Sequence, residues 1–295
     1  MSIFPAWCRP WAAGLSITTA TRQVNMSDFY WLSHRRYVEA GRMRWHAEQA
    51  DEAFWDNYWR EKVTPAYFSN AFAADLTGDE MGRILLAAMP ARGRHLEAGC
   101  GAGYWVAALR GAGLDVEGIE YARDLVERVN AVCPELPVRY GDALAIDCPD
   151  DTYASYLSFG VVEHRQDGPE PFLAEACRVV MPGGKAIISV PFLGPTRRTR
   201  ARLGRYEAAP PTPPFFQYGF TADEFTTLIE RAGFVIDATH PLYFHRMLLE
   251  ESSAYRWLYD RRFGRAWRRA LSGLFGNRDG HMLMVVAHKP VGGEK

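Results

Sequence analysis

The sequence lacks a long apolar run, a close cysteine pair and a large charge of either sign, and each absence excludes a class of protein. No stretch approaches the ~20 consecutive apolar residues that a membrane-spanning helix needs. The five cysteines are odd in number and form no C-x-x-C pair, which disfavours a disulfide framework and a structural zinc site. The formal net charge is −1, so an overall electrostatic attraction to nucleic acid is not expected. These absences predict a globular protein of the reducing cytoplasm that holds no metal and binds no nucleic acid.

The N-terminal part of the chain has two compositions. Residues 1–26 contain scattered Trp, Pro and Thr and lack the continuous apolar core of a secretory signal, so we expect a disordered leader. Met26 is followed by Ser27 and Asp28, a good helix N-cap pair, and translation starts at either Met1 or Met26.

Residues 27–89 are predicted to form a helical extension that caps the rest of the chain. The segment 27–60 is rich in aromatic residues, Arg and Glu, and we interpret it as one or two helices; another helix is expected over 78–89. The rings near the end of the first segment either pack the extension onto the main domain or close over a ligand through Tyr58 or Trp59.

Strands and helices alternate regularly from residue 94 onward, which predicts a parallel sheet with helices on both faces. We expect strands at 94–98, 115–119, 138–140, 154–159, 185–190, 234–241 and 282–288, and helices near 104–111, 122–132, 169–180 and 221–232. The last strand has no normal crossover helix before it and is expected to run antiparallel. The pattern predicts an α/β, Rossmann-like domain over 90–290, with a seven-stranded, mostly parallel sheet.

Two segments of this domain, 192–219 and 244–280, leave the carboxyl ends of strands, where open α/β sheets bind ligands. We therefore expect them to form a substrate cap together with the extension. The first contains five arginines between 197 and 205, which suit either a solvated loop or a lid that binds an anionic acceptor. In the second, residues 255–275 place an aromatic stripe opposite arginines at helical spacing, which suits a capping helix or an interfacial helix on anionic lipid.

The central motif is residues 94–103, RHLEAGCGAG, which is predicted to be a buried strand followed by a glycine turn. Its three glycines allow a ligand to lie close to the main chain, beside the amide groups that open the next helix. A dinucleotide fingerprint would place its third glycine or alanine where this chain has Tyr104, so a nicotinamide oxidoreductase is disfavoured.

Two acids follow the glycine turn at the ends of the next two strands. Glu120 stands 17 residues after Gly103, and an acid at that position can accept hydrogen bonds from both hydroxyls of a ribose. Asp142, which follows Gly141, is suited either to receive an exocyclic amine such as that of adenine or to form a turn. Together the turn and the acids predict a nucleoside site.

The ordered set EAGCGAG, GIE, YGDA, YLSFGVVEH and FLAEACRVVMPGGKAIISVP resembles a class I S-adenosylmethionine-dependent methyltransferase of the small-molecule type, over roughly residues 90–290. The resemblance implies S-adenosyl-L-methionine as the cofactor. The cofactor contacts that it implies are Glu97, Ala98, Gly99, Cys100, Gly101, Gly103, Glu120, Tyr121, Asp142, Ala143, Phe159 and Gly160.

A methyl group on a sulfonium is already activated, so such an enzyme mainly has to orient its acceptor and exclude water. A general base is needed chiefly for a hydroxyl or an acidic C–H. His164 follows the fourth strand, beside the expected position of the methyl group, and is the candidate base; a positioning role is the alternative. The candidate acceptor contacts are Tyr58, Trp59, Glu163, Phe192 and Tyr218.

The predicted function is methyl transfer from S-adenosylmethionine to a small organic acceptor, with the attacking atom (O, N or C) and the oligomeric state left open. One alternative is a peripheral-membrane methyltransferase that contacts the bilayer through 255–275 and acts on a lipid-linked or quinone-like acceptor. A third hypothesis is a non-catalytic protein that binds S-adenosylmethionine in the same pocket without transferring its methyl group. The expected location is the cytoplasm, with membrane association in the second case.

Overall fold

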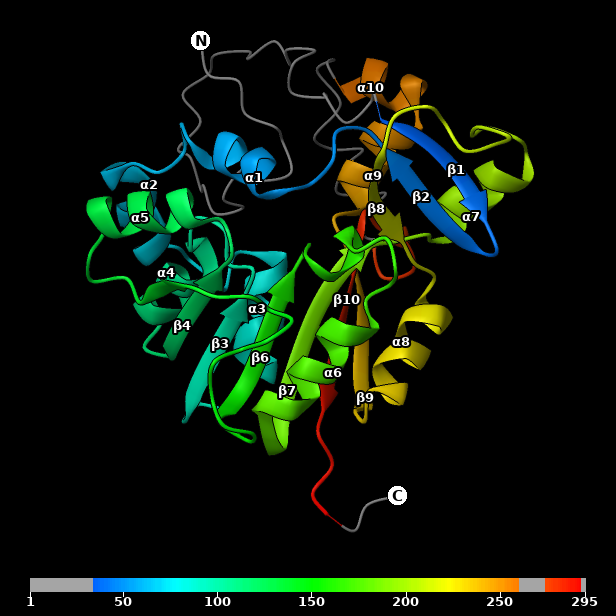
Figure 1. Cartoon of the computed structure of the whole chain (residues 1–295). Helices are drawn as coiled ribbons and strands as arrows, with labels where there is room; N and C mark the ends of the chain where they lie inside the picture. Colours follow the sequence, from blue (N-terminus) through cyan, green and yellow to red (C-terminus); the bar gives the residue numbers. More distant parts are fainter. Residues whose placement is uncertain (1–33, 260–273, 293–295) are drawn as a thin grey trace.

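The computed structural model describes residues 34–259 and 274–292, which form two sheets with helices around them (Figure 1). The predicted leader, 1–26, and the greater part of the predicted amphipathic helix, 255–275, lie outside the described residues. Among the described residues, no helix is both long and apolar enough to cross a membrane.

The larger sheet has seven strands in the order β5–β4–β3–β6–β7–β10–β9. Their bounds are β3 (Arg94–Ala98), β4 (Asp115–Glu120), β5 (Val138–Tyr140), β6 (Tyr153–Phe159), β7 (Val180–Pro191), β9 (Val235–Leu242) and β10 (Met282–His288). The first five in this order pair in parallel, whereas β10 is antiparallel to both β7 and β9. The predicted seven-stranded, mostly parallel sheet with an antiparallel last strand is therefore confirmed.

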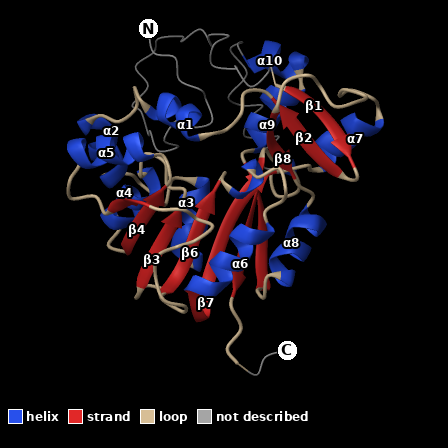
Figure 2. Cartoon of the chain, viewed as in Figure 1, coloured by secondary structure: helices blue, strands red, loops and turns tan. Residues whose placement is uncertain are grey.

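Helices cover both faces of this sheet (Figure 2). The first face packs against α2 (Pro65–Phe72), α3 (Glu80–Ala88), α4 (Tyr104–Gly111) and α5 (Arg123–Val132), and the second against α6 (Glu170–Val179) and α8 (Ala222–Arg231). Because side chains alternate along a strand, Leu157 and Ile187 enter the first core, while Tyr156 and Ile188 enter the second. The two cores fix the strand ends that carry the glycine turn.

The N-terminal extension contains a hairpin where we predicted helix. Its strands, β1 (Arg35–Glu39) and β2 (Arg42–His46), are antiparallel and joined by Ala40 and Gly41, both with positive φ. Two such residues between paired strands make the tight hairpin turn whose twist matches the strands. Met43 and Trp45 are buried on one face of β2, so the apolar spacing follows a period of two; the prediction of helix is wrong for these residues.

The hairpin forms the smaller sheet with β8 (Phe215–Gly219), which pairs antiparallel with β2. The extension continues through α1 (Glu52–Trp59), α2 and α3. The remaining described helices are α7 (Pro195–Arg202), α9 (Phe244–Glu251), α10 (Ser253–Tyr259) and the short 3₁₀ turn η3 (Val162–His164). The smaller sheet thus ties the segment 192–219 to the N-terminal extension.

Candidate active site

A cavity of about 470 Å³ opens at the carboxyl ends of β3, β4, β5 and β6. This is within the ~300–1,000 Å³ of typical small-molecule sites. Ten of the twelve predicted cofactor residues line it: Glu97, Gly99, Cys100, Gly101, Glu120, Tyr121, Asp142, Ala143, Phe159 and Gly160. The other two, Ala98 and Gly103, lie directly beside lining residues, at the end of β3 and at the start of α4.

Glu120 holds the glycine turn in place from the end of β4. Its Oε2 accepts a hydrogen bond from Gly101 N at 2.9 Å, and its Oε1 accepts from Tyr121 N and Ala122 N at 2.9 and 3.0 Å. Burial raises the pKa of this carboxyl, although the three backbone donors oppose the shift. The side chain lines the cavity and retains acceptor capacity for hydroxyl groups beyond these bonds.

Glu97 presents a second, different carboxyl at the end of β3. The side chain is buried, and its Oε2 has no hydrogen-bond partner among the described residues. Burial holds the pKa of Glu97 well above its usual range. A buried polar atom without a partner is costly, so this oxygen is suited to accept a hydrogen bond from a ligand amine.

Gly101 shows how closely α1 packs on the glycine turn. Its φ is +54°, in the left-handed region, and a Cβ there would lie 2.7 Å from the ring of Trp59. The indole of Trp59 therefore covers the turn, whose amides at Gly99, Cys100 and Gly101 already donate to Ile119 O and Glu120 Oε2. The carboxyls of Glu97 and Glu120 beside this turn suit a nucleoside that carries an amino acid.

Asp142 lies at the edge of the same cavity, after β5. Its Oδ1 accepts from Leu144 N at 2.8 Å, so the residue forms a turn as well as lining the cavity. The two sequence interpretations of Asp142, a turn and a ligand contact, are compatible in this geometry.

Aromatic rings form much of the remaining wall. The lining includes Trp55, Trp59, Tyr67, Tyr104, Trp105, Tyr140, Phe172 and Tyr243 in addition to the predicted Tyr121 and Phe159. Trp55 and Trp59 come from α1, which begins at the N-cap Asp51 and is bound to the first turn of α5 because Asp56 Oδ1 accepts from Leu125 N at 2.9 Å. The faces of such rings suit a sulfonium cation or a flat apolar acceptor.

His164 lines the cavity from η3, after β6. Its Nδ1 lies 2.8 Å from the carbonyl oxygen of Phe216. Because a carbonyl can only accept, Nδ1 carries the proton and the lone pair is on Nε2. Burial lowers the pKa of His164 to about 4, so the ring is neutral at physiological pH.

Glu163, the neighbour of His164, is 1% exposed and lies outside the cavity lining. Its Oε2 has no hydrogen-bond partner among the described residues, and burial raises its pKa to about 8. The side chain is therefore a neutral carboxylic acid near pH 7.

Of the other four predicted acceptor contacts, one lines the cavity and three lie outside its lining. Trp59 lines the cavity, whereas Tyr58, Phe192 and Tyr218 do not. The Tyr218 hydroxyl donates to the carbonyl oxygen of Gln166 at 2.7 Å, which fixes the loop after η3. None of the residues in 192–219 or in the described part of 244–280 lines the cavity, whereas α1, α2 and α3 of the extension contribute Trp55, Trp59, Tyr67 and Met81 to the lining.

Arg197 differs from both sequence interpretations of the arginine-rich segment. It is fully buried and bonds to Glu250 at 2.6 Å and Glu251 at 3.1 Å. A guanidinium neutralised in this way is neither solvated nor available to an acceptor, and both expectations are wrong for this arginine.

Sequence reasoning also missed several lining residues. Trp105 follows the glycine turn by two positions and could have been found by counting along the opening helix. Tyr243 and His281 gave no such signal, because they reach the cavity only through the pairing of β9 with β10. Tyr243 has φ 63°, a left-handed conformation that is uncommon for a non-glycine residue.

Comparison with known proteins agrees with this geometry. A family model for the methyltransferase domain matches residues 72–239, more than half of the 295-residue chain. The chain therefore belongs to the methyltransferase domain family, which confirms the resemblance to class I S-adenosylmethionine-dependent methyltransferases drawn from the sequence.

Two curated relatives match part of the chain. A Mycolicibacterium smegmatis protein named as an S-adenosylmethionine-dependent methyltransferase is 33% identical over 144 residues, which cover 49% of this chain and 52% of the relative. A demethylmenaquinone methyltransferase of Renibacterium salmoninarum is 32% identical over 108 residues, covering 35% of this chain and 45% of the relative. The chain thus spans about half the length of the curated relatives it matches.

A solved structure shows the same fold over a longer range. It is a chain in the complex between the Haloferax volcanii Trm112 methyltransferase activator and a methyltransferase. The similarity covers 83% of this chain and 97% of that chain, with a TM-score of 0.52 and 16% identity.

Proposed function

We propose that this protein transfers a methyl group from S-adenosyl-L-methionine to a small organic acceptor held beneath α1–α3. The observation that carries the proposal is one cavity with two kinds of wall. One set of lining residues, called the first side below, is the glycine turn with Glu97, Glu120 and Asp142, and the second set is aromatic rings with His164. The first set suits a nucleoside with an amino acid tail, and the second suits an acceptor.

The residues of the first side would bind by complementary hydrogen bonds. Glu120 would accept from ribose hydroxyls, Glu97 from the ligand's amino group and Asp142 from the adenine amine. Bound S-adenosylmethionine supplies an activated methyl group on a sulfonium. What remains for the protein is to align the acceptor and exclude water, an orientation effect that can contribute ~7–11 kcal/mol.

In this proposal His164 receives a proton from the acceptor. Its Nε2 lone pair is available because Nδ1–H is bound by the Phe216 carbonyl. With a pKa of about 4, the imidazole is a weak base that is unprotonated at Nε2 at neutral pH. This favours positioning of a hydroxyl, or deprotonation of an acidic one, over abstraction from a weak acid.

We infer the acceptor class from the aromatic residues of the second set. Rings of Trp55, Trp59 and Tyr67 from the cap face the same cavity as Trp105 and Phe159 from the main domain, so a flat, largely apolar ring would bury well there. The partial relative named as a demethylmenaquinone methyltransferase agrees with a quinone-like ring as the second candidate acceptor.

The test is methyl transfer from radiolabelled S-adenosylmethionine to a panel of phenols, quinols and aliphatic amines. We expect label in at least one ring acceptor and little in the amines. We also expect Trp55→Ala to raise the KM for that acceptor. Label only in the aliphatic amines would contradict the ring acceptor. Tight binding of S-adenosylhomocysteine with no transfer to the panel or to a metabolite extract would support the binding protein instead.

A further inference from the structure

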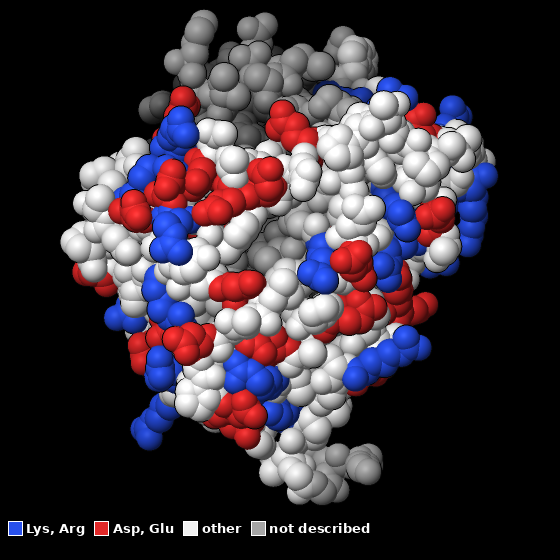
Figure 3. Space-filling view, in the orientation of Figure 1, with Lys and Arg blue, Asp and Glu red and all other residues white. Residues whose placement is uncertain are grey.

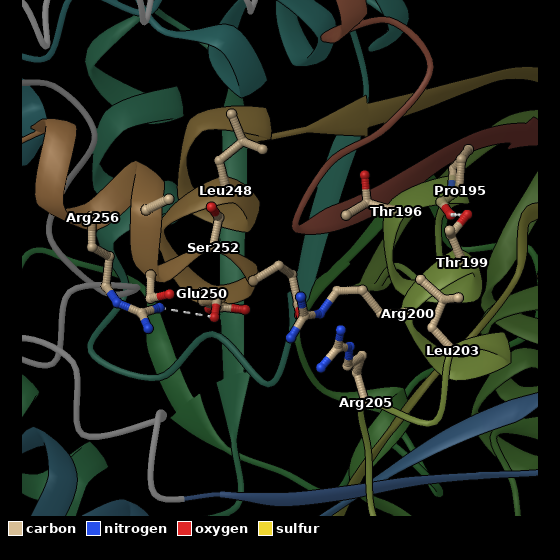
Figure 4. Close-up of a pocket in the computed structure, with 13 residues that line it drawn as sticks. Pro195, Thr196, Thr199, Arg200, Leu203, Arg205, Leu248, Glu250, Ser252 and Arg256 are labelled. Carbon is tan, nitrogen blue, oxygen red and sulfur yellow. Dashed lines mark hydrogen bonds and ion pairs between the residues drawn. The ribbon is translucent and has the colours of Figure 1, made fainter.

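A second hollow, of about 750 Å³, lies between α7 and the helices α9 and α10, apart from the cavity of the glycine turn. Figure 4 shows Arg200 and Arg205 on one side of it and Arg256 on the other. The hydroxyl-bearing residues Thr196 and Ser252 also line it. The site therefore combines guanidinium and hydroxyl donors, the groups that recognise phosphate.

The end of α7 brings two of these arginines together. Arg205 N donates to Arg200 O at 3.0 Å and Gly204 N to Ala201 O at 3.0 Å, while Gly204 has φ +63°. This is the pattern of a glycine-terminated helix, in which the chain folds back over the last turn. Arg205 is consequently directed to the same hollow as Arg200, although like charges repel.

Arg256 is fixed independently from α10. Its Nη1 donates to the carbonyl oxygens of Leu249 and Glu250, at the C-terminal end of α9. The remaining N–H groups of this guanidinium are not used by these bonds. Arg256 therefore holds its position without a carboxylate and keeps donors for a ligand.

The carboxylates in the floor of the hollow neutralise only part of this charge. Glu251 already contacts Arg36 at 2.6 Å, Arg197 at 3.1 Å and Arg200 at 2.9 Å. Glu250 contacts Arg197 and Arg246 in the same network. Two carboxylates are thus shared among four arginines, and Arg205 and Arg256 have no carboxylate partner in the part of the chain that the structure describes.

Exposed apolar side chains lie at the end of α7 and on α10, two of the helices that border the hollow. Leu203, which lines it at the end of α7, is 66% exposed, and Trp257, the neighbour of Arg256, is 57% exposed. A free phosphate ion would leave both side chains in water. At a bilayer surface, by contrast, headgroup phosphates lie beside an apolar layer, where Trp and Leu are favourable.

We infer that the hollow between α7 and α9–α10 binds the phosphate of an anionic lipid headgroup and attaches the protein to a membrane surface. Arg200, Arg205 and Arg256 donate to the phosphate oxygens, and Leu203 and Trp257 enter the interfacial layer. This attachment does not depend on the acceptor proposed above, because it uses none of the residues of the first cavity.

The experiment compares two double variants of the full chain that lose the same charge. Arg200→Gln with Arg205→Gln changes the hollow, and Arg198→Gln with Arg202→Gln changes exposed arginines of α7 outside its lining. Both keep the arginines between 261 and 269, so any contribution from those cancels. Because Arg200 also contacts Glu251, the single variant Arg205→Gln is included, and S-adenosylhomocysteine affinity checks each fold.

Binding is measured by cosedimentation with vesicles of phosphatidylcholine, with and without phosphatidylglycerol, and by calorimetry with inorganic pyrophosphate. We expect binding only to the anionic vesicles, weakened about fivefold for each arginine removed from the hollow and much less in the α7 control. Leu203→Ser should weaken vesicle binding and leave pyrophosphate binding unchanged. Equal loss in both double variants, no vesicle binding, or binding of pyrophosphate alone would overturn the proposal.

Discussion

At the scale of single residues, the neighbours Glu163 and His164, which follow β6, have pKa shifts of opposite direction although both are buried. Burial favours the neutral form of each group, so it lowers the pKa of His164 to about 4 and raises that of Glu163 to about 8. Both side chains are therefore uncharged near pH 7.

The protonation of His164 leads to a direct prediction. We expect its ring resonances, assigned from the spectrum of a His164→Gln variant, to stay constant between pH 6 and 8, where an ordinary histidine with a pKa near 6.5 titrates. The change should appear only as the pH falls towards 4. A midpoint above 6 would contradict the assignment of Nε2 as a permanently available lone pair.

At the scale of elements, α1 lies over the glycine turn because one of its side chains binds it to the main domain. Asp56 Oδ1 accepts from the buried Leu125 N at 2.9 Å, and Arg128 donates to the Asp56 carbonyl at 3.0 Å. These bonds place Trp59 over the glycine turn and Trp55 in the cavity wall. The position of the cap therefore depends on a contact between residues 69 positions apart in the chain.

We expect Asp56→Ala to loosen the cap. Leaving a buried N–H without its acceptor costs ~1–3 kcal/mol, and much of this should appear as local opening of α1. The measurement is amide hydrogen exchange over 52–59 together with the affinity for S-adenosylhomocysteine, and both should show a weaker cap. Asp124→Ala, at an exposed site in the first turn of α5, is the control and should change neither. Unchanged protection in Asp56→Ala would contradict this role.

The elements also show where prediction from sequence succeeds. The strands and helices from 94 to 190 were predictable because apolar runs, glycine turns and helix caps are local signals. The start of α8 is a further local signal, because Thr221 Oγ1 accepts from Glu224 N as the T-x-x-E pattern indicates. The β1–β2 hairpin was not predicted, because its only local signal is the two-residue spacing of Met43 and Trp45 in a segment whose composition also suits a helix.

The rest of the site could not be predicted for a physical reason. Burial of Arg197 requires Glu250 and Glu251, more than 50 residues away, and nothing local distinguishes it from its exposed neighbour Arg198. Likewise, Tyr243 and His281 become cavity residues only when β10 inserts between β7 and β9. Long-range pairing, and not the local pattern, decides these positions.

At the scale of the whole molecule, the shifted groups predict a stability maximum. His34, His164 and His281 have pKa values of about 4, below their ordinary 6.5, mainly because of burial. Between pH 4 and 6.5 the unfolded chain binds more protons than the folded one, so stability rises with pH. Between pH 4.5 and 8, Glu163 is protonated in the folded state, where its pKa is about 8, and ionised in the unfolded state. Its contribution to stability therefore falls as the pH rises.

We therefore expect the free energy of unfolding to be largest near pH 6.5 and to fall towards pH 8. The contribution of Glu163 to that fall is at most ~2 kcal/mol, from about 1.4 kcal/mol per pH unit. Urea unfolding at pH 5, 6.5 and 8 tests this, with Glu163→Gln expected to reduce the loss between pH 6.5 and 8. A fall of the same size in the variant would show that another group causes it.

The central claim is that the cavity at the glycine turn binds the methyl donor through Glu120. The most direct measurement is calorimetric titration of S-adenosylhomocysteine into the wild type, Glu120→Ala and the control Glu117→Ala, whose carboxylate lies on the same strand but pairs with Arg94. We predict tight binding by the wild type and by Glu117→Ala, and at least a ~10-fold weaker affinity for Glu120→Ala, because hydrogen bonds to a charged group contribute ~1.5–3 kcal/mol. Absence of binding by the wild type, or equal affinity in Glu120→Ala, would contradict the account.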